Sequence, residues 1–297
     1  MNNLWGKILK MNIYINMLNS FIRILFITLI LFFSPFIQAG MGGRLPSFFN
    51  AHEHLIQPDI ANIARLRFVT TFDFPPFNFL DKTGHLAGYN ADLLRAICIK
   101  LTLEKLCEVE VVPREELVNH LNSDEAEAMI AGLEETTEMH QYFAFTQTYL
   151  RFPARFVSYK SLNLNDLINN KLEYLKSGFL INSAYEKLFH SYFPKAKWQG
   201  FNDRKMLYKA LQDHEIDLIF DDGLALSLWI NDPQSIDCCL FVGEAYIAPQ
   251  FLGAGMRIAV AKKNAELVDI LNYALKSLER DGKLTELYLR YFPVSFY

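Results

Sequence analysis

The segment from Phe68 to Leu101 constrains the fold of this chain more than any other, because strand, turn and helix signals follow one another in it without a break. Residues 68–70 favour a β-strand, and the Pro75-Pro76 pair cannot continue that strand, so the chain must turn there. Residues 81–84 predict a second, tight reversal that ends in a glycine. A strand that ends in a rigid aromatic turn places ring faces at the carboxyl edge of a sheet, where α/β proteins bind small molecules.

Aromatic side chains crowd this turn, and they divide into two kinds. We interpret Phe77 and Phe79 as ordinary core residues, and Phe74 as a candidate wall of a binding site. The helix that follows is predicted to take Asn90 as its N-cap and to bury one face, since Leu93 and the apolar residues after it recur at helical spacing.

The turn and the helix start together contain a set of residues in a fixed order: Asp73, Phe74, Pro76, Phe77, Phe79, Gly88, Tyr89, Asn90, Asp92 and Leu93. With this set, the segment resembles the opening of the family 3 solute-binding proteins, which are extracytoplasmic receptors of polar amino acid ABC transporters. The resemblance covers residues 66–292. It implies a two-lobe periplasmic-binding-protein fold of type II, with parallel-rich sheets flanked by helices, two hinge crossings and a ligand cleft between the lobes.

Strand and helix signals alternate along the rest of the chain, which by itself predicts an α/β protein with parallel sheets and helices on both faces. Residues 216–220 form a continuous apolar run, which is typical of a buried parallel strand. The resemblance then implies how the chain divides. Lobe 1 comprises residues 62–155 and 262–297, and lobe 2 comprises residues 156–261.

The N-terminus has the pattern of a secretory signal peptide, with basic residues, an apolar run from Ile24 to Phe33 and a small-residue exit at Ala39. An uncleaved membrane anchor is the alternative, but the run is shorter than the about 20 apolar residues that cross a bilayer. We therefore expect residues 1–39 to be removed, residues 40–61 to form a lead segment, and the mature protein to be periplasmic. Met17 is an alternative start.

The chain carries 29 Lys and Arg residues against 33 Asp and Glu residues, a formal net charge of −4, without a basic stripe. Such a chain has no electrostatic basis for binding nucleic acid. We find no Ser-His-Asp order, metal-ligand spacing or phosphate loop, so we expect no enzyme activity, no metal and no cofactor. The resemblance implies instead a small-molecule ligand, an amino acid or an amine, and an ABC permease in the inner membrane as the partner of a monomeric receptor.

The four cysteines form two pairs in the sequence. The resemblance implies a disulfide between Cys98 and Cys107, and export makes oxidation reasonable; two free buried thiols are the alternative. For Cys238 and Cys239, which are adjacent, both a disulfide and two separate thiols stay open.

The resemblance also implies candidate site residues in lobe 1. The family grips the carboxylate of its ligand with an arginine that follows a glycine-containing strand end, matched here by Gly132. In the same register, Met139 occupies the arginine position, and Glu134 occupies a position that carries a hydroxyl in the family. A thioether cannot replace the two hydrogen bonds of a guanidinium. The next residue, His140, points about 100° away on a helix and is not expected to substitute for it.

The aromatic turn supplies Asp73 and Phe74 to the same site. Arg114 corresponds to a position at which the family often has a second stacking residue, and it could stack on a ligand or bind an anion. A solvated loop arginine is the alternative reading of Arg114.

Two further candidates lie in lobe 2. Ser183 corresponds to a helix start at which the family binds the ligand carboxylate, although capping of that helix would explain this serine equally well. Asp222 follows the apolar strand and corresponds to the aspartate that binds the α-ammonium group in the family. Capping of the next helix is again the alternative.

These residues lead to a hypothesis about the ligand. Glu134 and Asp222 are acidic, and burying two carboxylates without cationic partners is costly. We therefore expect an amine-bearing or cationic ligand rather than a generic α-amino acid. Two alternatives use the same scaffold: a periplasmic enzyme similar to cyclohexadienyl dehydratases, with Glu134 as its acid, or a receptor that has lost transport and serves sensing.

Overall fold

The computed structural model describes residues 45–49, 56–133, 135–162, 164, 171–233, 235 and 237–297. The expected signal peptide, residues 1–39, and its exit at Ala39 lie outside the described residues, as do residues 40–44 and 50–55 of the lead segment. Within the described ranges, no helix is long and apolar enough to cross a membrane.

The sheet of lobe 1 has five strands in the order β5-β1-β6-β13-β7. Strand β1 (Leu66–Thr70) runs parallel to β5 (Cys107–Val111) and to β6 (Ala128–Met129). Strand β13 (Ala259–Ala261) runs antiparallel to β6 and to β7 (Phe143–Phe145). The sheet is therefore parallel on one side and antiparallel on the other, and agrees with the parallel-rich sheet that was expected.

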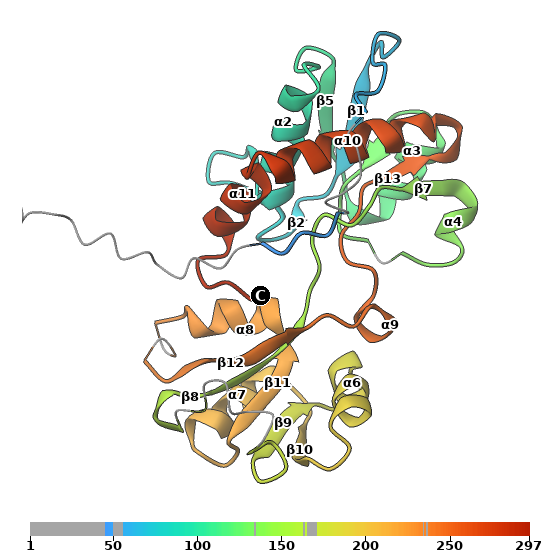
Figure 1. Ribbon diagram of the computed structural model, residues 1–297. Coiled ribbons are helices and arrows are strands. Elements are labelled where there is room, and N and C mark those ends of the chain that lie inside the picture. Colours follow the sequence, from blue (N-terminus) through green and yellow to red (C-terminus); the bar gives the residue numbers. More distant parts are fainter. Residues whose placement is uncertain are drawn as a thin grey trace, which may run out of the picture. The chain divides into compact units, whose positions relative to one another are not determined.

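Three long helices build the main core of lobe 1. Helices α2 (Tyr89–Lys100), α10 (Glu266–Arg280) and α11 (Lys283–Tyr291) contact one another and bury their apolar faces in one cluster with β1 (Figure 1). Helix α3 (Leu117–Asn122) packs with β6, β7 and β13 in a smaller, second cluster. Both faces of the sheet are thus covered, as the sequence predicted.

The aromatic turn forms a small sheet of its own, in which β3 (Asn78–Leu80) pairs with both β2 (Asp73–Phe74) and β4 (Leu86–Ala87). Phe77 in the turn is buried, as predicted for a core residue, and Phe79 is half-buried.

The start of α2 differs from the prediction, because its N-cap is Gly88 and not Asn90. The backbone N–H groups of Tyr89 and Asn90 donate to the carbonyls of the preceding turn, so the helix begins earlier. Asn90 is buried instead, and its Oδ1 accepts a hydrogen bond of 2.9 Å from the hydroxyl of Tyr149.

The sheet of lobe 2 also has five strands, in the order β10-β9-β11-β8-β12. Strand β9 (Lys176–Leu180) runs parallel to β10 (Lys197–Phe201) and to β11 (Leu218–Asp222). Strand β8 (Ala154–Tyr159) runs antiparallel to β11 and to β12 (Cys239–Tyr246). The apolar run predicted as a buried strand is therefore β11, which is parallel to one neighbour and antiparallel to the other.

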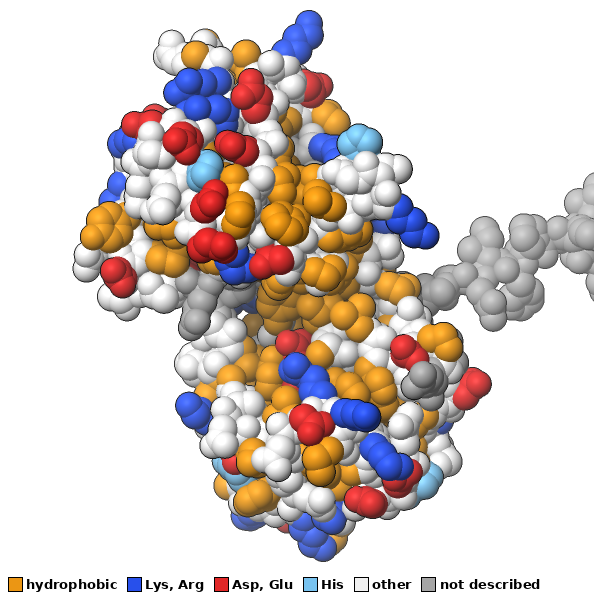
Figure 2. All heavy atoms as spheres, turned by 180° about the vertical axis from the view of Figure 1, so that it is seen from behind, with side chains coloured by type: hydrophobic (Ala, Val, Ile, Leu, Met, Phe, Trp, Pro, Cys, Tyr) orange, Lys and Arg blue, Asp and Glu red, His pale blue; other side chains and the backbone are white. Residues whose placement is uncertain are grey.

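Helices cover both faces of this second sheet. One apolar cluster joins it to α6 (Ala184–Tyr192) and α9 (Pro249–Leu252), and another joins it to α7 (Arg204–Gln212) and α8 (Gly223–Ile230). Four further helices in the described ranges are short: η1 (Arg114–Glu116), α4 (Met139–Tyr142), η2 (Lys160–Leu162) and η4 (Lys262–Asn264). On the face shown in Figure 2, acidic and basic side chains of the described residues are interspersed.

The boundaries between the lobes are shifted from those expected. Strand β13 (residues 259–261) pairs with strands of the lobe 1 sheet, whereas the bounds implied by the resemblance placed these residues at the end of lobe 2. Strand β8 begins at Ala154, two residues before the expected start of lobe 2. The sequence of a short strand next to a crossing does not indicate which sheet the strand joins, because backbone hydrogen bonding to neighbouring strands alone decides this.

Two chain segments, residues 146–153 and 247–258, connect the lobes. They pair with each other at the lobe 1 end, through a bridge between Leu150 and Met256. The C-terminal residue Tyr297 contacts the first crossing, because its hydroxyl accepts from the backbone N–H of Arg151, at 3.1 Å, and donates to the carbonyl of the same residue.

A disulfide joins Cys98, late in α2, to Cys107, the first residue of β5, with the two Cα atoms 6.2 Å apart. This bond confirms the pairing that the resemblance implied. A second disulfide joins the adjacent residues Cys238 and Cys239, and no free cysteine is found in the described part of the chain.

Removal of the Cys98–Cys107 bond tests its contribution to stability. The double variant Cys98→Ala, Cys107→Ala is expected to lower the free energy of unfolding by about 2–3 kcal/mol, because the bond closes a short loop in the unfolded chain. Urea unfolding under oxidising conditions measures the change. The control is Cys238→Ala, Cys239→Ala, since a bond between neighbours closes almost no chain; an equal loss in both double variants would contradict the loop-closure argument.

Candidate functional site

The carboxyl ends of the parallel strands β1, β5 and β6 lie at one edge of the lobe 1 sheet. Four of the predicted site residues follow these ends, namely Asp73 and Phe74 after β1, Arg114 after β5 and Gly132 after β6. The contacts below show that the structure brings all four together.

Asp73 and Arg114 form a bidentate ion pair. The Nη2 atom of Arg114 lies 2.9 Å from Oδ1 of Asp73, and its Nε lies 3.2 Å from Oδ2. Thr71 donates a further hydrogen bond of 2.6 Å to Oδ1. The hydrogen bond from Arg114, followed by that from Thr71, lowers the pKa of the Asp73 carboxyl. The carboxylate remains 47% exposed, so it can still be reached from solvent.

Phe74 is held by contacts on its faces and at its edge. Its ring stacks on Phe77 with centroids 4.8 Å apart, and the guanidinium carbon of Arg114 lies 5.5 Å from its centroid. Gly132 has a φ of +62°, and a Cβ atom there would lie only 2.3 Å from Cε1 of the ring. The absence of a side chain at Gly132 therefore allows the strand end to approach the ring edge.

Met139 brings no polar side chain to the position at which the family has its arginine. Met139 is the first residue of α4, is half-buried, and packs against the second apolar cluster of lobe 1 with Leu133 and Phe143. Its backbone N–H donates to Oγ1 of Thr136 at 3.3 Å. The other residue predicted in this loop, Glu134, lies outside the described residues.

A cluster in the same loop was missed from the sequence. Oε1 of Glu135 lies 2.6 Å from Nε2 of His140 and 3.1 Å from a guanidinium nitrogen of Arg257. Nε of Arg257 also donates to Oγ1 of Thr148, at 3.0 Å. Arg257 and Thr148 belong to the two crossing segments, so the cluster ties this loop to both crossings. No sequence signal marked it, because Glu135 and Arg257 are far apart in the chain.

In lobe 2, the parallel strands β9, β10 and β11 bring their carboxyl ends to one edge, where α6, α7 and α8 begin. Ser183 is the N-cap of α6, and its hydroxyl accepts from the N–H of Glu186 at 3.1 Å. Oε2 of Glu186 accepts in turn from the N–H of Asn182 at 2.6 Å. This arrangement is similar to a capping box, except that Glu186 accepts from the residue before the N-cap, so Ser183 has the structural role that the sequence left open as an alternative.

Asp222 is the N-cap of α8. Its Oδ1 accepts from the backbone N–H groups of Leu224 and Ala225, at 2.8 and 3.3 Å. Tyr185, in the first turn of α6, lies next to this carboxylate. Burial, followed by the negative charge of Asp222, raises the pKa of the Tyr185 hydroxyl. Ser183 and Asp222 thus lie at the starts of two helices along the same sheet edge.

A second ion pair at this edge was also missed. Asp221 is fully buried, and its two carboxylate oxygens accept from Nε and Nη2 of Arg204, at 2.7 and 3.2 Å. Burial raises the pKa of the Asp221 carboxyl, while Arg204 opposes that shift. The sequence does contain a signal for this site, namely an acidic residue directly after an apolar strand. From that signal, only Asp222 was predicted as a site residue.

In the described ranges, no group of three or more His, Cys, Asp and Glu side chains is arranged to hold a metal ion. The two edges present instead an aromatic ring, paired arginines and several carboxylates. Such groups can bind a small polar molecule through hydrogen bonds, charge and ring contacts.

Comparison with known proteins extends this picture. The family described as bacterial extracellular solute-binding proteins, family 3, matches residues 66–294. The L-arginine-binding protein of Pseudomonas aeruginosa is 26% identical over 232 residues, which cover 75% of this chain and 86% of that protein. The histidine-binding periplasmic protein of Salmonella typhimurium is 24% identical over 236 residues, which cover 78% of this chain and 89% of that protein.

Among solved structures, the L-cystine solute receptor of Neisseria gonorrhoeae, in its unliganded open conformation, shares the fold. Its TM-score is 0.64 at 20% sequence identity, and the match covers 79% of this chain and 95% of that chain. The expected two-lobe, type II fold is thereby confirmed. Since the family match also extends over most of the sequence, this chain belongs to the bacterial extracellular solute-binding proteins of family 3.

Proposed function

We propose that this protein is the periplasmic substrate-binding component of an ABC transporter, and that it binds an amino acid or a related amine-bearing small molecule between its lobes. The observation that carries this proposal is the group of Asp73, Phe74, Arg114 and Gly132 at the carboxyl edge of the lobe 1 sheet. Such edges are where open α/β sheets bind ligands. The named relatives are binding proteins for arginine and histidine, which supports binding over dehydratase activity.

In this proposal each candidate residue has a role. Phe74 is the aromatic wall, and Gly132 allows it to sit against the strand end. Asp73 and Asp222 receive positively charged groups of the ligand from lobe 1 and lobe 2, while Arg114 adjoins Phe74. Glu134, Met139 and Ser183 are assigned to the rim of the same site, where Met139 contributes no charge.

We also propose how the protein reaches its place of action and which partner it serves. The protein is exported by a signal peptide that is cleaved near Ala39, acts as a monomer, and delivers its ligand to a permease in the inner membrane. Rotation of the lobes about the two crossings, the normal motion of such receptors, would enclose the ligand.

Calorimetry on protein that has been unfolded and refolded, to remove co-purified ligand, tests the proposal. We expect saturable one-to-one binding of at least one compound from a panel of arginine, ornithine, histidine, glutamine and diamines. Gly132→Ala should weaken that binding about tenfold or more, because a Cβ atom would displace the Phe74 ring.

The matched control is Gly282→Ala. Gly282 also has a positive φ, +77°, but a Cβ atom there meets nothing within 4 Å. The Gly282→Ala variant should therefore bind the ligand as tightly as the unaltered protein does. If the refolded protein binds no compound of the panel, and mass spectrometry finds no small molecule on the protein as purified, the proposed function is wrong.

A further inference from the structure

We propose that the ligand of this site is an organic cation without a carboxylate group, such as a diamine or an alkylguanidine. This inference rests on the proposed function and specifies its ligand class. The reason is that the guanidinium groups near both sheet edges, and two of the three helix starts at the lobe 2 edge, are already bound to carboxylates or rings of the chain itself.

The first evidence for this ligand class comes from the helices that begin at the lobe 2 edge. A free helix N-terminus binds carboxylates well, but here α7 and α8 are capped by aspartates, and α6, capped by Ser183, has a glutamate in its first turn. Glu186 accepts from the N–H of Asn182 before α6, at 2.6 Å. Asp203 accepts from Met206 in α7 at 2.8 Å, and Asp222 caps α8. A ligand carboxylate would therefore meet negative charge at each of these three places.

The arginines close to the edges are also engaged. Arg114, Arg204 and Arg257 are each paired with a carboxylate, at closest distances of 2.9, 2.7 and 3.1 Å. The first two pairs are bidentate, so both oxygens of the acid share one guanidinium. These three guanidinium groups would have to leave a partner before they could bind a ligand carboxylate.

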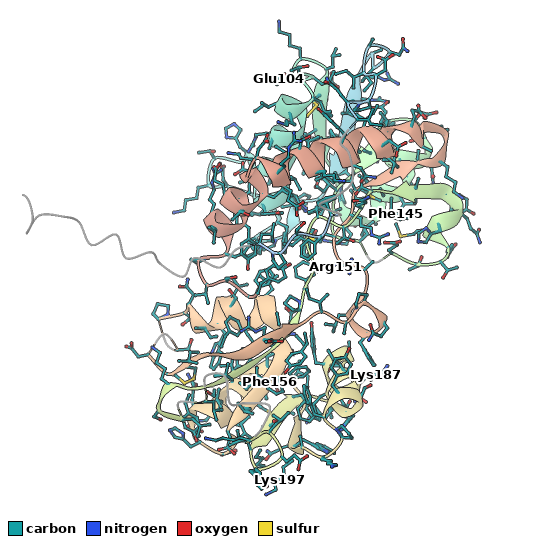
Figure 3. All side chains as sticks on the ribbon, in the orientation of Figure 1. Glu104, Phe145, Arg151, Phe156, Lys187 and Lys197 are labelled. Atoms are coloured by element: carbon teal, nitrogen blue, oxygen red, sulfur yellow. A yellow bond between two sulfur atoms is a disulfide. The ribbon has the colours of Figure 1, made fainter. Side chains whose placement is uncertain are left out.

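Two further arginines, one in the first crossing and one at the start of β8, each lie over an aromatic ring. The guanidinium carbon of Arg151, which is labelled in Figure 3, is 5.7 Å from the centroid of Phe48. That of Arg155 is 4.5 Å from the centroid of Phe241, and Arg155 is only 6% exposed. Arg151 belongs to no strand, and Arg155 lies opposite Asp221 at the carboxyl end of β11 but is buried.

A positive observation comes from Arg114. Its guanidinium donates two hydrogen bonds to Asp73 and lies over the Phe74 ring, so this corner of the site already binds a cation within the chain. Asp73 is about half exposed. An amine or guanidine of a ligand can take the place of the Arg114 side chain there, because it would use the same carboxylate and the same ring.

Lobe 1 also contains a carboxylate that could bind a second cationic or N–H group of the ligand. Oε2 of Glu135 is buried and has no hydrogen-bond partner among the described residues. A buried carboxylate oxygen without a donor is unfavourable, and a ligand N–H group can supply one. A ligand with cationic or N–H groups at two points thus fits these edges, whereas an added carboxylate would lose its hydration without gaining a donor.

Matched pairs of ligands that differ only in the carboxylate provide the test. We expect agmatine to bind about tenfold or more tightly than arginine, and putrescine more tightly than ornithine, in calorimetry on the refolded protein. Tighter binding of arginine and ornithine would overturn this inference while leaving the proposed function intact. Failure of all four compounds, and of histidine and histamine, would contradict both.

The direction in which Arg114→Met changes the affinity for ligands distinguishes between two roles of Arg114. If its side chain competes with the ligand, Arg114→Met should tighten agmatine binding several-fold; if it instead grips a ligand carboxylate, the variant should bind arginine more weakly and agmatine unchanged. Asp73→Asn should weaken agmatine binding about tenfold or more. The control is Asp81→Asn in the nearby hairpin, where the carboxylate only accepts from its own turn, and this variant should bind as before. Unchanged agmatine binding in Asp73→Asn would contradict the inference.

Discussion

Replacement of Gly88 by alanine is expected to lower the free energy of unfolding by about 3 kcal/mol or more. Gly88 has a φ of +121° and caps α2, and a Cβ atom there would lie 2.2 Å from the backbone oxygen of Phe77. Backbone strain in a region reserved for glycine costs about 1–3 kcal/mol, and the clash adds to it. The same carbonyl accepts from Asn90, so relief of the clash would break a hydrogen bond at the helix start.

Urea unfolding followed by circular dichroism measures this loss, and Gly84→Ala is its control. Gly84 also has a positive φ, +81°, but a Cβ atom there meets nothing within 4 Å. The control should therefore lose only the cost of the left-handed backbone, about 1–2 kcal/mol. Equal stability of the two variants would show that the close approach at Gly88 is not what requires glycine there.

Replacement of Arg204 by methionine is expected to cost about 2–3 kcal/mol of unfolding free energy at neutral pH. The change leaves the carboxylate of Asp221 fully buried without its cation. Breaking a buried pair typically costs about 3–5 kcal/mol, and the value here is reduced because the Arg204 side chain is 41% exposed to solvent.

The loss in Arg204→Met should depend on pH in a defined direction. Burial raises the pKa of Asp221 even beside Arg204, and removal of the arginine raises that pKa further. A carboxyl whose pKa is higher in the folded state favours folding when it is protonated. The defect should therefore be largest above the folded pKa and shrink as the pH falls toward the unfolded value of about 3.9.

Unfolding at pH 7 and at pH 5 checks this dependence. The double variant Arg204→Met, Asp221→Asn removes the buried charge, and should be more stable than the single variant at pH 7. A defect in Arg204→Met that stays constant with pH, or grows on acidification, would rule out an unpaired buried carboxylate as its cause.

Much of the fold follows from local patterns in the sequence. Helix α6 begins directly after Ser183, as expected, because an N-cap serine, a glutamate in the first turn and an apolar face all agree there. Strands β10 and β12 were not predicted. In β10 the burial is shallow and a glycine interrupts the run, while β12 contains an irregularity between Val242 and Tyr246. Such strands are specified by their neighbours more than by their own residues.

The site was predictable only in part. Asp73 and Phe74 come from one continuous motif, so the sequence placed them correctly beside each other. Their contact with Arg114 depends on the parallel pairing of β1 with β5, and that register is a property of the sheet. The same holds for Arg204 and Asp221, because a strand end and a helix start meet only once the second sheet has formed. Pairings of this kind leave no local signal.

The pairing of the two crossing segments has a mechanical consequence. The bridge between Leu150 and Met256, and the hydrogen bond from Thr148 to the carbonyl of Ala254, fasten the crossings together on the lobe 1 side, while β8 pairs with β12 in lobe 2. Residues 151–153 of the first crossing lie between these two pairings and form a short pivot. The hydroxyl of Tyr297 is bonded to the peptide of the first residue of that pivot. The C-terminal segment is thus a third tether, and any rotation of the lobes must either carry it along or release it.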